Sequence, residues 1–322
     1  MRYIIFGAGA IGGVIGARLF RVGKEVVLIA RGEHLEALQR HGLRLETPEW
    51  TETLKIPAIS SPTKMVFQKG DAIILGMKSQ DTIAALETLR TAGGDHLPII
   101  CTQNGVANER MALRRFEKVY AMVVMLPATH LESGLVQQNS APVPGILDAG
   151  CFPQGVDPTI ETVSSDLREA GFSSRTDPKV MRLKYAKLLL NLGNAFQVIC
   201  GQEADGRDLM KAARQEALQC YQEAGIDFAG DEEFRNRRGD FIRVPPGGDV
   251  RRQGSSSWQS IIRGTGTVES DWLNGEICLL GRLYGVPTPV NRLLQTTANQ
   301  VAKNGLMPGT ITADDLRRQL KF

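Results

Sequence analysis

The sequence has few of the residues that build metal sites and disulfide frameworks. It contains only four histidines, with no H-E-x-x-H motif or other paired-ligand spacing, so we expect no metal. Cysteines are odd in number and form no C-x-x-C pair, which argues against both a disulfide framework and a zinc site. Reduced thiols in a core are the simpler interpretation. The residues are His34, His41, His96 and His130, and Cys101, Cys151, Cys200, Cys220 and Cys278.

Long hydrophobic runs and an excess of one charge are also missing. No stretch reaches the ~18 uninterrupted apolar residues that a membrane span needs, and the apolar N-terminal run reads as strand, glycine turn and helix rather than as a secretory signal. There are 38 basic residues against 35 acidic ones, too even a balance for a nucleic-acid footprint. We therefore expect a cytoplasmic enzyme that acts on a small molecule and binds neither membrane nor nucleic acid.

The 322 residues are enough for two domains at roughly 150 residues each. In the first half, apolar runs alternate with helical patterns, which predicts an α/β domain with a doubly wound parallel sheet. From Val180 onward helical periodicity dominates. We place the boundary so that residues 1–177 form the sheet domain and residues 178–322 a helical one. The apolar runs are 2–6, 25–30, 71–77, 97–101 and 119–126.

Three segments depart from this plan. Residues 42–61 alternate polar and apolar side chains around Pro48, which predicts an antiparallel excursion. Residues 130–150 resemble a second β insertion. The segment 230–257 is charged and rich in glycine, proline and serine, so we expect a loop there rather than packed structure.

A glycine fingerprint follows the first predicted strand and begins the first predicted helix. The residues are Gly7, Ala8, Gly9, Ala10, Ile11 and Gly12. In such a G-x-G-x-x-G turn, Gly7 permits the tight turn, Gly9 lets the backbone approach a pyrophosphate, and Gly12 allows helix and strand to pack closely. The phosphates then lie on the N–H groups of the helix N-terminus. An ordinary glycine-rich turn is the alternative.

Arg31 stands where an NAD-binding site normally has an acidic residue. A carboxylate at the end of the second strand binds the ribose 2′-hydroxyl of NAD. Here the strand runs into Arg31, and a guanidinium can instead bind a 2′-phosphate with two hydrogen bonds. This favours NADP(H), with a solvated loop arginine as the alternative.

A predicted helix beginning near Val180 carries three polar residues on one face. At 100° per residue, Asn191 and Asn194 lie within about 40° of Lys187, and leucines surround them. Such groups need polar partners or a wet cleft if they are buried. A solvated stripe of the helix is equally compatible with the pattern.

Taken together, these motifs resemble the ketopantoate reductase family over nearly the whole chain. The resemblance rests on the glycine turn, on Lys78 after the 71–77 run, on the turn Gln103-Asn104-Gly105, on the K-L-x-x-N helix from Lys187, and on the segment 269–275. Each motif is weak alone, and their joint order is specific.

The resemblance implies a fold and an activity. The fold is an N-terminal Rossmann-like NADP(H)-binding domain followed by an all-helical substrate-binding and catalytic domain like the C-terminal domain of 6-phosphogluconate dehydrogenase. The implied activity is the NADPH-dependent reduction of a 2-ketoacid, first of all 2-dehydropantoate to pantoate in pantothenate and coenzyme A biosynthesis, or of a related branched ketoacid. A homodimer is a further expectation.

The resemblance also assigns roles to residues. Lys187 would be the general acid of carbonyl reduction, with Glu269 its carboxylate partner. Lys78 and Asn104 would lie near the nicotinamide and ribose of the cofactor. The substrate hydroxyl and carboxylate would be held by Asn191 and Ser257, with Asn194 as a further contact.

Other assignments stay open at this point. Lys184, one turn before Lys187, is a rival proton donor. Glu269 follows Thr267 and fits a helix-start carboxylate, while Asn104-Gly105 fits a plain turn and Lys78 a solvated strand end. Asp271 and Asn274 either bind substrate or face water.

Two departures and two other functions also bear on the substrate side. Asn194 comes seven residues after Lys187, where well-known family members have eight, and the loop before Ser257 is longer than theirs. Another dehydrogenase of the same two-domain plan, of the opine, 3-hydroxyacid or glycerol-3-phosphate type, is one alternative function. A non-catalytic NADPH-sensing protein is the other.

Overall fold

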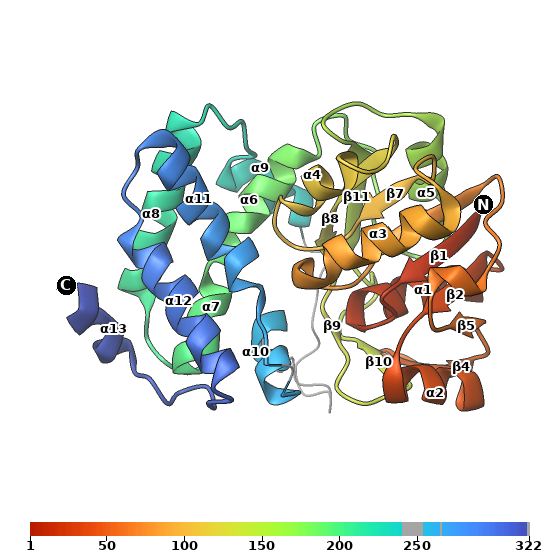
Figure 1. Ribbon diagram of the computed structural model, residues 1–322, viewed down its shortest axis with the longest axis horizontal. Helices are drawn as coiled ribbons and strands as arrows, with labels where there is room; N and C mark the ends of the chain where they lie inside the picture. Colours follow the sequence, from red (N-terminus) through yellow and green to blue (C-terminus); the bar gives the residue numbers. More distant parts are fainter. Residues whose placement is uncertain (240–253, 265, 321–322) are drawn as a thin grey trace. The chain divides into compact units, whose positions relative to one another are not determined.

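The computed structural model describes residues 1–239, 254–264 and 266–320. Contacts divide the described chain into two compact units. The first comprises residues 1–103, 108–184 and 230–239, and the second comprises residues 104–107, 185–229 and 254–320 apart from 265. Each unit is described separately below, and Figure 1 shows their elements.

The first unit is built on a seven-stranded sheet in the order β11-β8-β7-β6-β1-β2-β5. All neighbouring strands are parallel except β11, which runs antiparallel to β8. The strand order reverses at β1, as the predicted doubly wound plan requires. The strands are β1 (Arg2–Phe6), β2 (Glu25–Ile29), β5 (Ala58–Ile59), β6 (Asp71–Leu75), β7 (Ile99–Cys101), β8 (Val119–Met125) and β11 (Ile146–Cys151).

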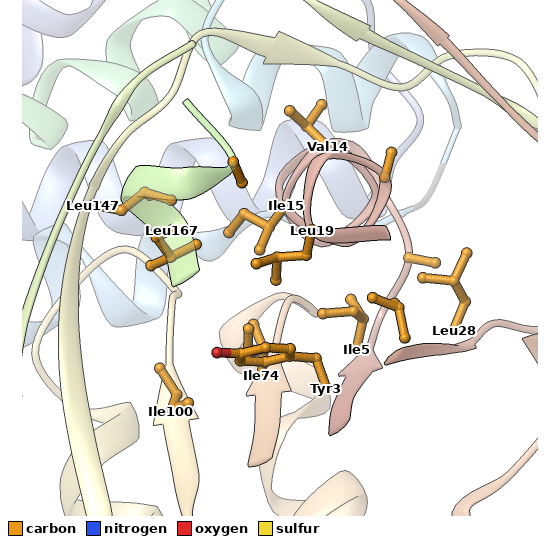
Figure 2. Close-up of a cluster of buried hydrophobic side chains, with 14 of the residues drawn as sticks. Tyr3, Ile5, Val14, Ile15, Leu19, Leu28, Ile74, Ile100, Leu147 and Leu167 are labelled. Atoms are coloured by element: carbon orange, nitrogen blue, oxygen red, sulfur yellow. The ribbon is translucent and has the colours of Figure 1, made fainter. Parts of the chain in front are cut away.

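Helices connect these strands. They are α1 (Ala10–Arg21), α2 (Gly32–His41), α3 (Thr82–Gly93), α4 (Asn108–Leu113) and α5 (Pro158–Glu169), with short 3-10 turns η1 (Pro62–Lys64) and η2 (Ser79–Asp81). Because the sheet is covered, its central strands β1 and β6 are apolar after their first residues, Arg2 and Asp71, which form an ion pair. Figure 2 shows Ile15 and Leu19 of α1 near Tyr3 and Ile5 of β1, and all four side chains are fully buried.

Strands from the two predicted β insertions form one small sheet, which the sequence did not predict, while β5 and β11 from the same segments join the seven-stranded sheet instead. The small sheet has the order β4-β3-β10-β9, formed by β3 (Leu43–Glu46), β4 (Thr51–Leu54), β9 (Ala128–Thr129) and β10 (Leu135–Gln138). The antiparallel β3–β4 pair lies within the predicted excursion at 42–61. Parallel pairing of β10 with β3 then joins segments about ninety residues apart, a long-range contact that no local pattern reports.

The second unit is helical in its described residues. It contains the end of α6 (Met181–Asn191), then α7 (Gly193–Cys200), α8 (Arg207–Glu223), α10 (Ser256–Ile262), the 3-10 turn η3 (Glu269–Trp272), α11 (Asn274–Tyr284), α12 (Pro289–Lys303) and α13 (Ala313–Leu320). A separate hydrophobic core includes Phe196, Ile199, Leu209, Leu294 and Leu316. In the described part of the chain, no helix has the length and apolar character of a membrane span.

Part of the predicted loop at 230–257 is folded. Helix α9 (Asp231–Arg238) belongs to the first unit, while residues 240–253 lie outside the described residues. Acidic residues fill the first turn of α9 and arginines its last, which suits the helix dipole. Phe234 is buried, and buried Arg237 pairs with Asp148 of β11. Composition alone indicated a loop because these partners are distant in sequence.

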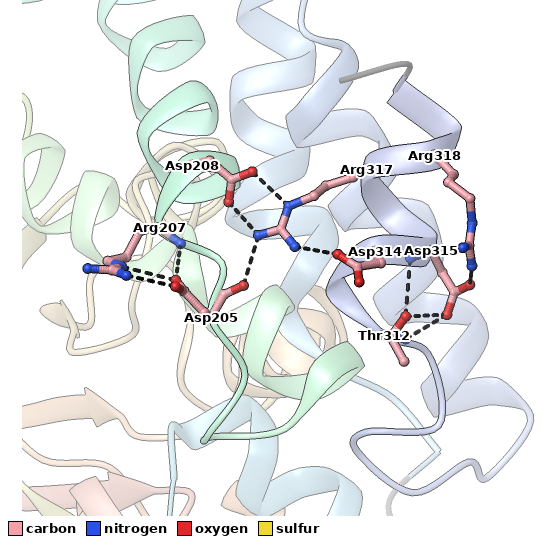
Figure 3. Close-up of polar contacts among 8 residues, drawn as sticks. All are labelled: Asp205, Arg207, Asp208, Thr312, Asp314, Asp315, Arg317 and Arg318. Carbon is pink, nitrogen blue, oxygen red and sulfur yellow. Dashed lines mark hydrogen bonds and ion pairs between the residues drawn. The ribbon is translucent and has the colours of Figure 1, made fainter.

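An exposed ion-pair cluster fastens the C-terminal helix to the second unit. Arg317 of α13 donates hydrogen bonds of 2.8 Å to both carboxylate oxygens of Asp208 at the start of α8, and a third of 3.0 Å to the carbonyl of Asp205 (Figure 3). Thr312 caps α13 through reciprocal hydrogen bonds with Asp315. A bidentate arginine–carboxylate contact has the geometry that gives an exposed pair real strength.

Candidate active site

The glycine turn after β1 is packed too tightly for side chains at two of its three glycines. A Cβ on Gly12 would lie 2.2 Å from the carbonyl oxygen of Gly7, and a Cβ on Gly7, where φ is +99°, would lie 2.5 Å from the backbone nitrogen of Met77. The turn, the start of α1 and the end of β6 are therefore in backbone contact. These glycines have the packing roles that the fingerprint assigns to the first and third positions.

Gly9 is different, because its Cβ direction is not filled by backbone. The nearest heavy atom to that position is Cδ2 of His130, at 3.7 Å. Gly9 is also the N-cap of α1, whose first turn has neither a side-chain cap nor an acidic residue, while Arg18 and Arg21 lie in its last turn. An uncapped helix N-terminus with an uncovered glycine beside it suits a phosphate group. The turn thus fits a dinucleotide.

Arg31 extends into solvent directly after β2. It is the N-cap residue of α2, and its side chain is 84% exposed. One guanidinium nitrogen lies 3.2 Å from the carboxylate of Asp81. Exposed pairs of this kind contribute little stability, so the guanidinium remains accessible to a phosphate ligand. Lys78 is half-buried and precedes η2, three residues after β6 ends.

A buried polar network fixes the loops that follow β6 and β7. Gln103 donates to the hydroxyl of Thr82 at 3.2 Å, and Thr82 donates to Asn108 at 2.8 Å. Asn108 in turn donates to the hydroxyl of Ser79 at 3.0 Å. All four residues are buried, and their hydrogen bonds tie these backbone segments together. The side-chain oxygen of Gln103 is itself buried without a hydrogen-bond partner among the described residues. The network determines where the chain on either side of Asn104 is placed.

The side chain of Lys184, on α6, is buried in the first unit and held there by polar groups. Its ammonium lies 2.6 Å from the Glu109 carboxylate and donates to the backbone carbonyls of Gln103 at 3.0 Å and Met122 at 3.3 Å. The side chain is 3% exposed and that of Glu109 is fully buried. Two of its three donors are engaged by these carbonyls, and the buried carboxylate balances its charge. This geometry argues against Lys184 as a proton donor to substrate.

Lys187 lies one turn further along α6 and has a different environment. It is half-buried in the second unit, and its ammonium donates a 2.6 Å hydrogen bond to the side-chain oxygen of Asn104. The two residues are more than eighty positions apart. Asn104 is therefore more than a plain turn residue, because its amide oxygen directs the ammonium of Lys187.

The same turn packs against the segment that contains Glu269. Gly105 has φ +78°, and a Cβ there would lie 2.8 Å from the backbone carbonyl oxygen of Trp272, the last residue of η3. Glu269 is the first residue of η3, and only 4% of it is exposed. The N-cap position is taken by Val268 rather than Thr267. Burial distinguishes Glu269 from an ordinary solvated helix-start carboxylate.

Matches to known families agree with this arrangement. Residues 3–154 match the family model described as ketopantoate reductase PanE/ApbA, and residues 179–302 match the model of its C-terminal domain. The chain belongs to the ketopantoate reductase family.

Whole-length relatives extend this result. The 2-dehydropantoate 2-reductases of Pyrococcus horikoshii and Archaeoglobus fulgidus are each 29% identical over 302 residues, covering 91% of this chain and 95% of theirs. A solved PanE/ApbA family ketopantoate reductase from Ralstonia eutropha is 29% identical, with a TM-score of 0.78 over 95% of this chain and 99% of that one. The fold is also that of a D-mandelate dehydrogenase solved with NADH and anilino(oxo)acetate, at 22% identity and a TM-score of 0.81 over 95% of this chain and 99% of that one.

Two of the residues that we expect to bind the substrate of a ketopantoate reductase share one feature. The side-chain oxygens of Asn191 and Ser257 are buried and accept or donate no hydrogen bond among the described residues. Buried polar atoms normally have partners, so a ligand with polar groups suits both. Asn191 ends α6, and Ser257 lies in the first turn of α10.

The predicted single helix through Asn194 is interrupted at Leu192. Helix α6 ends at Asn191, and α7 begins at Gly193. Leu192 between them keeps helical dihedral angles, with φ −58° and ψ −31°, and its backbone carbonyl accepts a 3.2 Å hydrogen bond from the side chain of Asn274. Asn194 lies half-buried in α7.

Asp271 and Asn274 have different environments. Asn274 is fully buried, and its amide nitrogen donates to Leu192 and Asn291, while its side-chain oxygen is buried without a hydrogen-bond partner among the described residues. Asp271 is exposed and accepts 2.7 Å hydrogen bonds from Gln295 and Asn299 of α12. Among the described residues, no group of histidine, cysteine and acidic side chains has the geometry of a metal site.

Sequence reasoning missed the residues that support the site. Glu109 lies in a short helix, and nothing in its neighbourhood marks it as the partner of Lys184. His34 and His130 were noted only for lacking metal-ligand spacing, yet their rings lie 4.4 Å apart. Both pairs are formed by tertiary contacts, so no local signal could have identified them.

Proposed function

We propose that this protein reduces a 2-ketoacid with NADPH, with 2-dehydropantoate as the first substrate and pantoate as its product. The observation that carries the proposal is the 2.6 Å hydrogen bond from Lys187 to Asn104, in the same unit as buried Glu269. The engagement of Lys184 with Glu109 and two carbonyls supports Lys187 as the donor. A place in pantothenate and coenzyme A biosynthesis would follow from this substrate. A cytoplasmic location and a homodimer stay predictions.

The cofactor residues belong mainly to the first unit. The turn from Gly7 to Gly12 would hold the pyrophosphate, Arg31 the 2′-phosphate, and Lys78 and Asn104 the nicotinamide end. When bound, the reduced nicotinamide supplies a hydride to the carbonyl carbon of the substrate. Arg31 favours NADPH, while the NADH bound by the D-mandelate dehydrogenase neighbour keeps NADH as the cofactor to compare.

Lys187 has the chemistry that carbonyl reduction needs from the protein. Reduction leaves negative charge on the former carbonyl oxygen, and an ammonium both stabilises that charge and donates the proton that produces the hydroxyl. Asn104 orients the ammonium through its side-chain oxygen. The Glu269 carboxylate would favour the charged form of the lysine and its reprotonation after turnover.

The substrate would be held by polar atoms that lack partners in the described protein. The amide of Asn191 and the hydroxyl of Ser257 are assigned to the substrate hydroxyl and carboxylate, because their buried oxygens have no hydrogen-bond partner among the described residues. Asn194 would add a contact from α7. Fixing both ends of a small ketoacid holds its carbonyl in one orientation, which is worth several orders of magnitude in rate.

The test is NADPH consumption against a panel of 2-ketoacids. The panel contains 2-dehydropantoate, other branched 2-ketoacids and phenylglyoxylate, the ketoacid of mandelate, and each is assayed with NADPH and with NADH. We expect the highest kcat/KM for 2-dehydropantoate with NADPH, and its loss in Lys187→Ala. Tight NADPH binding without oxidation by any ketoacid would instead identify a sensing protein.

A further inference from the structure

Two of the four histidines lie together beside the glycine turn. His34 is in the first turns of α2, and His130 is in the loop between β9 and β10. Their ring centroids are 4.4 Å apart with the ring planes tilted by 53°. All these elements belong to the first unit. Neither histidine has a role in the reaction proposed above.

Hydrogen bonds determine the protonation of His34. Its Nε2 lies 2.8 Å from the carbonyl oxygen of Ala8, and its Nδ1 lies 2.9 Å from the backbone nitrogen of Gly134. A carbonyl can only accept and a backbone N–H can only donate, so Nε2 carries the hydrogen and Nδ1 carries none. His34 is a neutral imidazole that links the glycine turn to the β9–β10 loop. Burial lowers the pKa of His34, in agreement with this neutral form.

His130 is held with one edge toward the turn. Its Nδ1 lies 2.9 Å from the carbonyl oxygen of Leu135, so that nitrogen carries a hydrogen and donates it. On the other side of the ring is Cδ2, the atom bonded to Nε2. This Cδ2 is the nearest heavy atom, at 3.7 Å, to the position that a Cβ on Gly9 would occupy. The ring therefore stands over the glycine whose missing side chain admits a pyrophosphate.

We propose that His130 is a cofactor-binding residue that contacts the diphosphate of the dinucleotide, and that His34 positions it and the glycine turn. Because Nδ1 of His130 already donates to Leu135, the ring donates to a phosphate oxygen from Nε2 in its protonated form, which also adds positive charge. His34 ties Ala8 of the turn and Gly134 of the loop to one rigid ring, so the two sides of the phosphate site keep a fixed separation. The inference rests on the dinucleotide use proposed above.

Binding rather than turnover tests this inference. The probes are NADPH and 2′-phospho-ADP-ribose, which has the diphosphate but no nicotinamide, and dissociation constants are measured by titration calorimetry without ketoacid. His130→Ala should weaken the binding of both probes by about tenfold, the scale of one charge-assisted hydrogen bond. His130→Gln keeps a donor and should lose less. His96→Ala is the matched control, because His96 is exposed after α3, and it should bind both probes as the wild type does.

The outcomes separate this inference from the proposed function. Wild-type affinity of His130→Ala for both probes overturns the inference and leaves the reductase proposal intact. A loss for NADPH alone also overturns it, because the contact would then be at the nicotinamide end. If the alanine variant is unfolded by circular dichroism, the glutamine variant decides, and wild-type affinity in that variant overturns the contact. A wild-type protein that binds neither probe overturns both proposals.

Discussion

Replacing Lys184 by methionine keeps the length of the side chain and removes its charge and three donors. The Glu109 carboxylate, fully buried and 2.6 Å from the lost ammonium, is then left without its cation. Removing one partner of a buried ion pair costs about 3–5 kcal/mol. For a domain of this size, each kcal/mol lowers Tm by roughly 2–4 °C, so the expected decrease is about 6–20 °C.

Lys187→Met should behave in the opposite way. Lys187 is half-buried and donates a hydrogen bond to the amide oxygen of Asn104, so losing this contact costs about 1 kcal/mol of stability. The loss of a positioned general acid should lower kcat by roughly 10²-fold or more while NADPH binding survives.

Calorimetry and steady-state kinetics, the latter well below the unfolding transition, distinguish the two lysines. The control is the double variant Lys184→Met with Glu109→Gln, which removes both buried charges and should recover most of the lost stability. If Lys184→Met lost kcat with an unchanged Tm, or if Lys187→Met stayed active, the assignment of the donor would be refuted.

Three further predictions follow from other contacts. Arg31→Ala should weaken the binding of NADPH far more than that of NADH, because only NADPH carries a 2′-phosphate. Equal losses of affinity for the two cofactors in fluorescence titrations would show that Arg31 does not bind this phosphate. Glu269→Gln should lower kcat or raise the ketoacid KM and should alter the pH profile of activity, while the cofactor Kd stays unchanged. Its effect should be far from additive with that of Lys187→Ala, and strict additivity would mean that Glu269 has only a structural role. Hydrogen bonds from Arg317 lower the pKa of Asp208 to about 2, so the stability that they give α13 is present above the ordinary carboxyl value of ~3.9 and is lost as the pH falls toward 2. The protection of α13 amides, measured relative to their intrinsic exchange rate at each pH, should therefore fall in acid, and in Arg317→Leu it should be low already at neutral pH; wild-type protection in that variant would contradict the pairing.

The sequence by itself determined the class of fold and the order of its motifs. Alternating apolar runs and helices predicted the doubly wound sheet, and the glycine turn fell where the sheet and α1 meet. These features are local, since a strand, a turn and a helix are each specified by residues close together in the chain. The family resemblance added the later motifs, because their order along the chain needs no knowledge of contacts.

Tertiary structure alone decided which of these residues have partners. Lys184 and Lys187 are one helical turn apart and look equivalent in sequence, yet one is bound to Glu109 in a core and the other to Asn104. The charged segment after Gly230 looked like a loop until Asp148 supplied a buried partner for Arg237. The hydrogen bond from Asn274 to the carbonyl of Leu192 likewise joins residues more than eighty positions apart. Charge burial and hydrogen-bond satisfaction are set by such distant neighbours, so a local pattern cannot determine them.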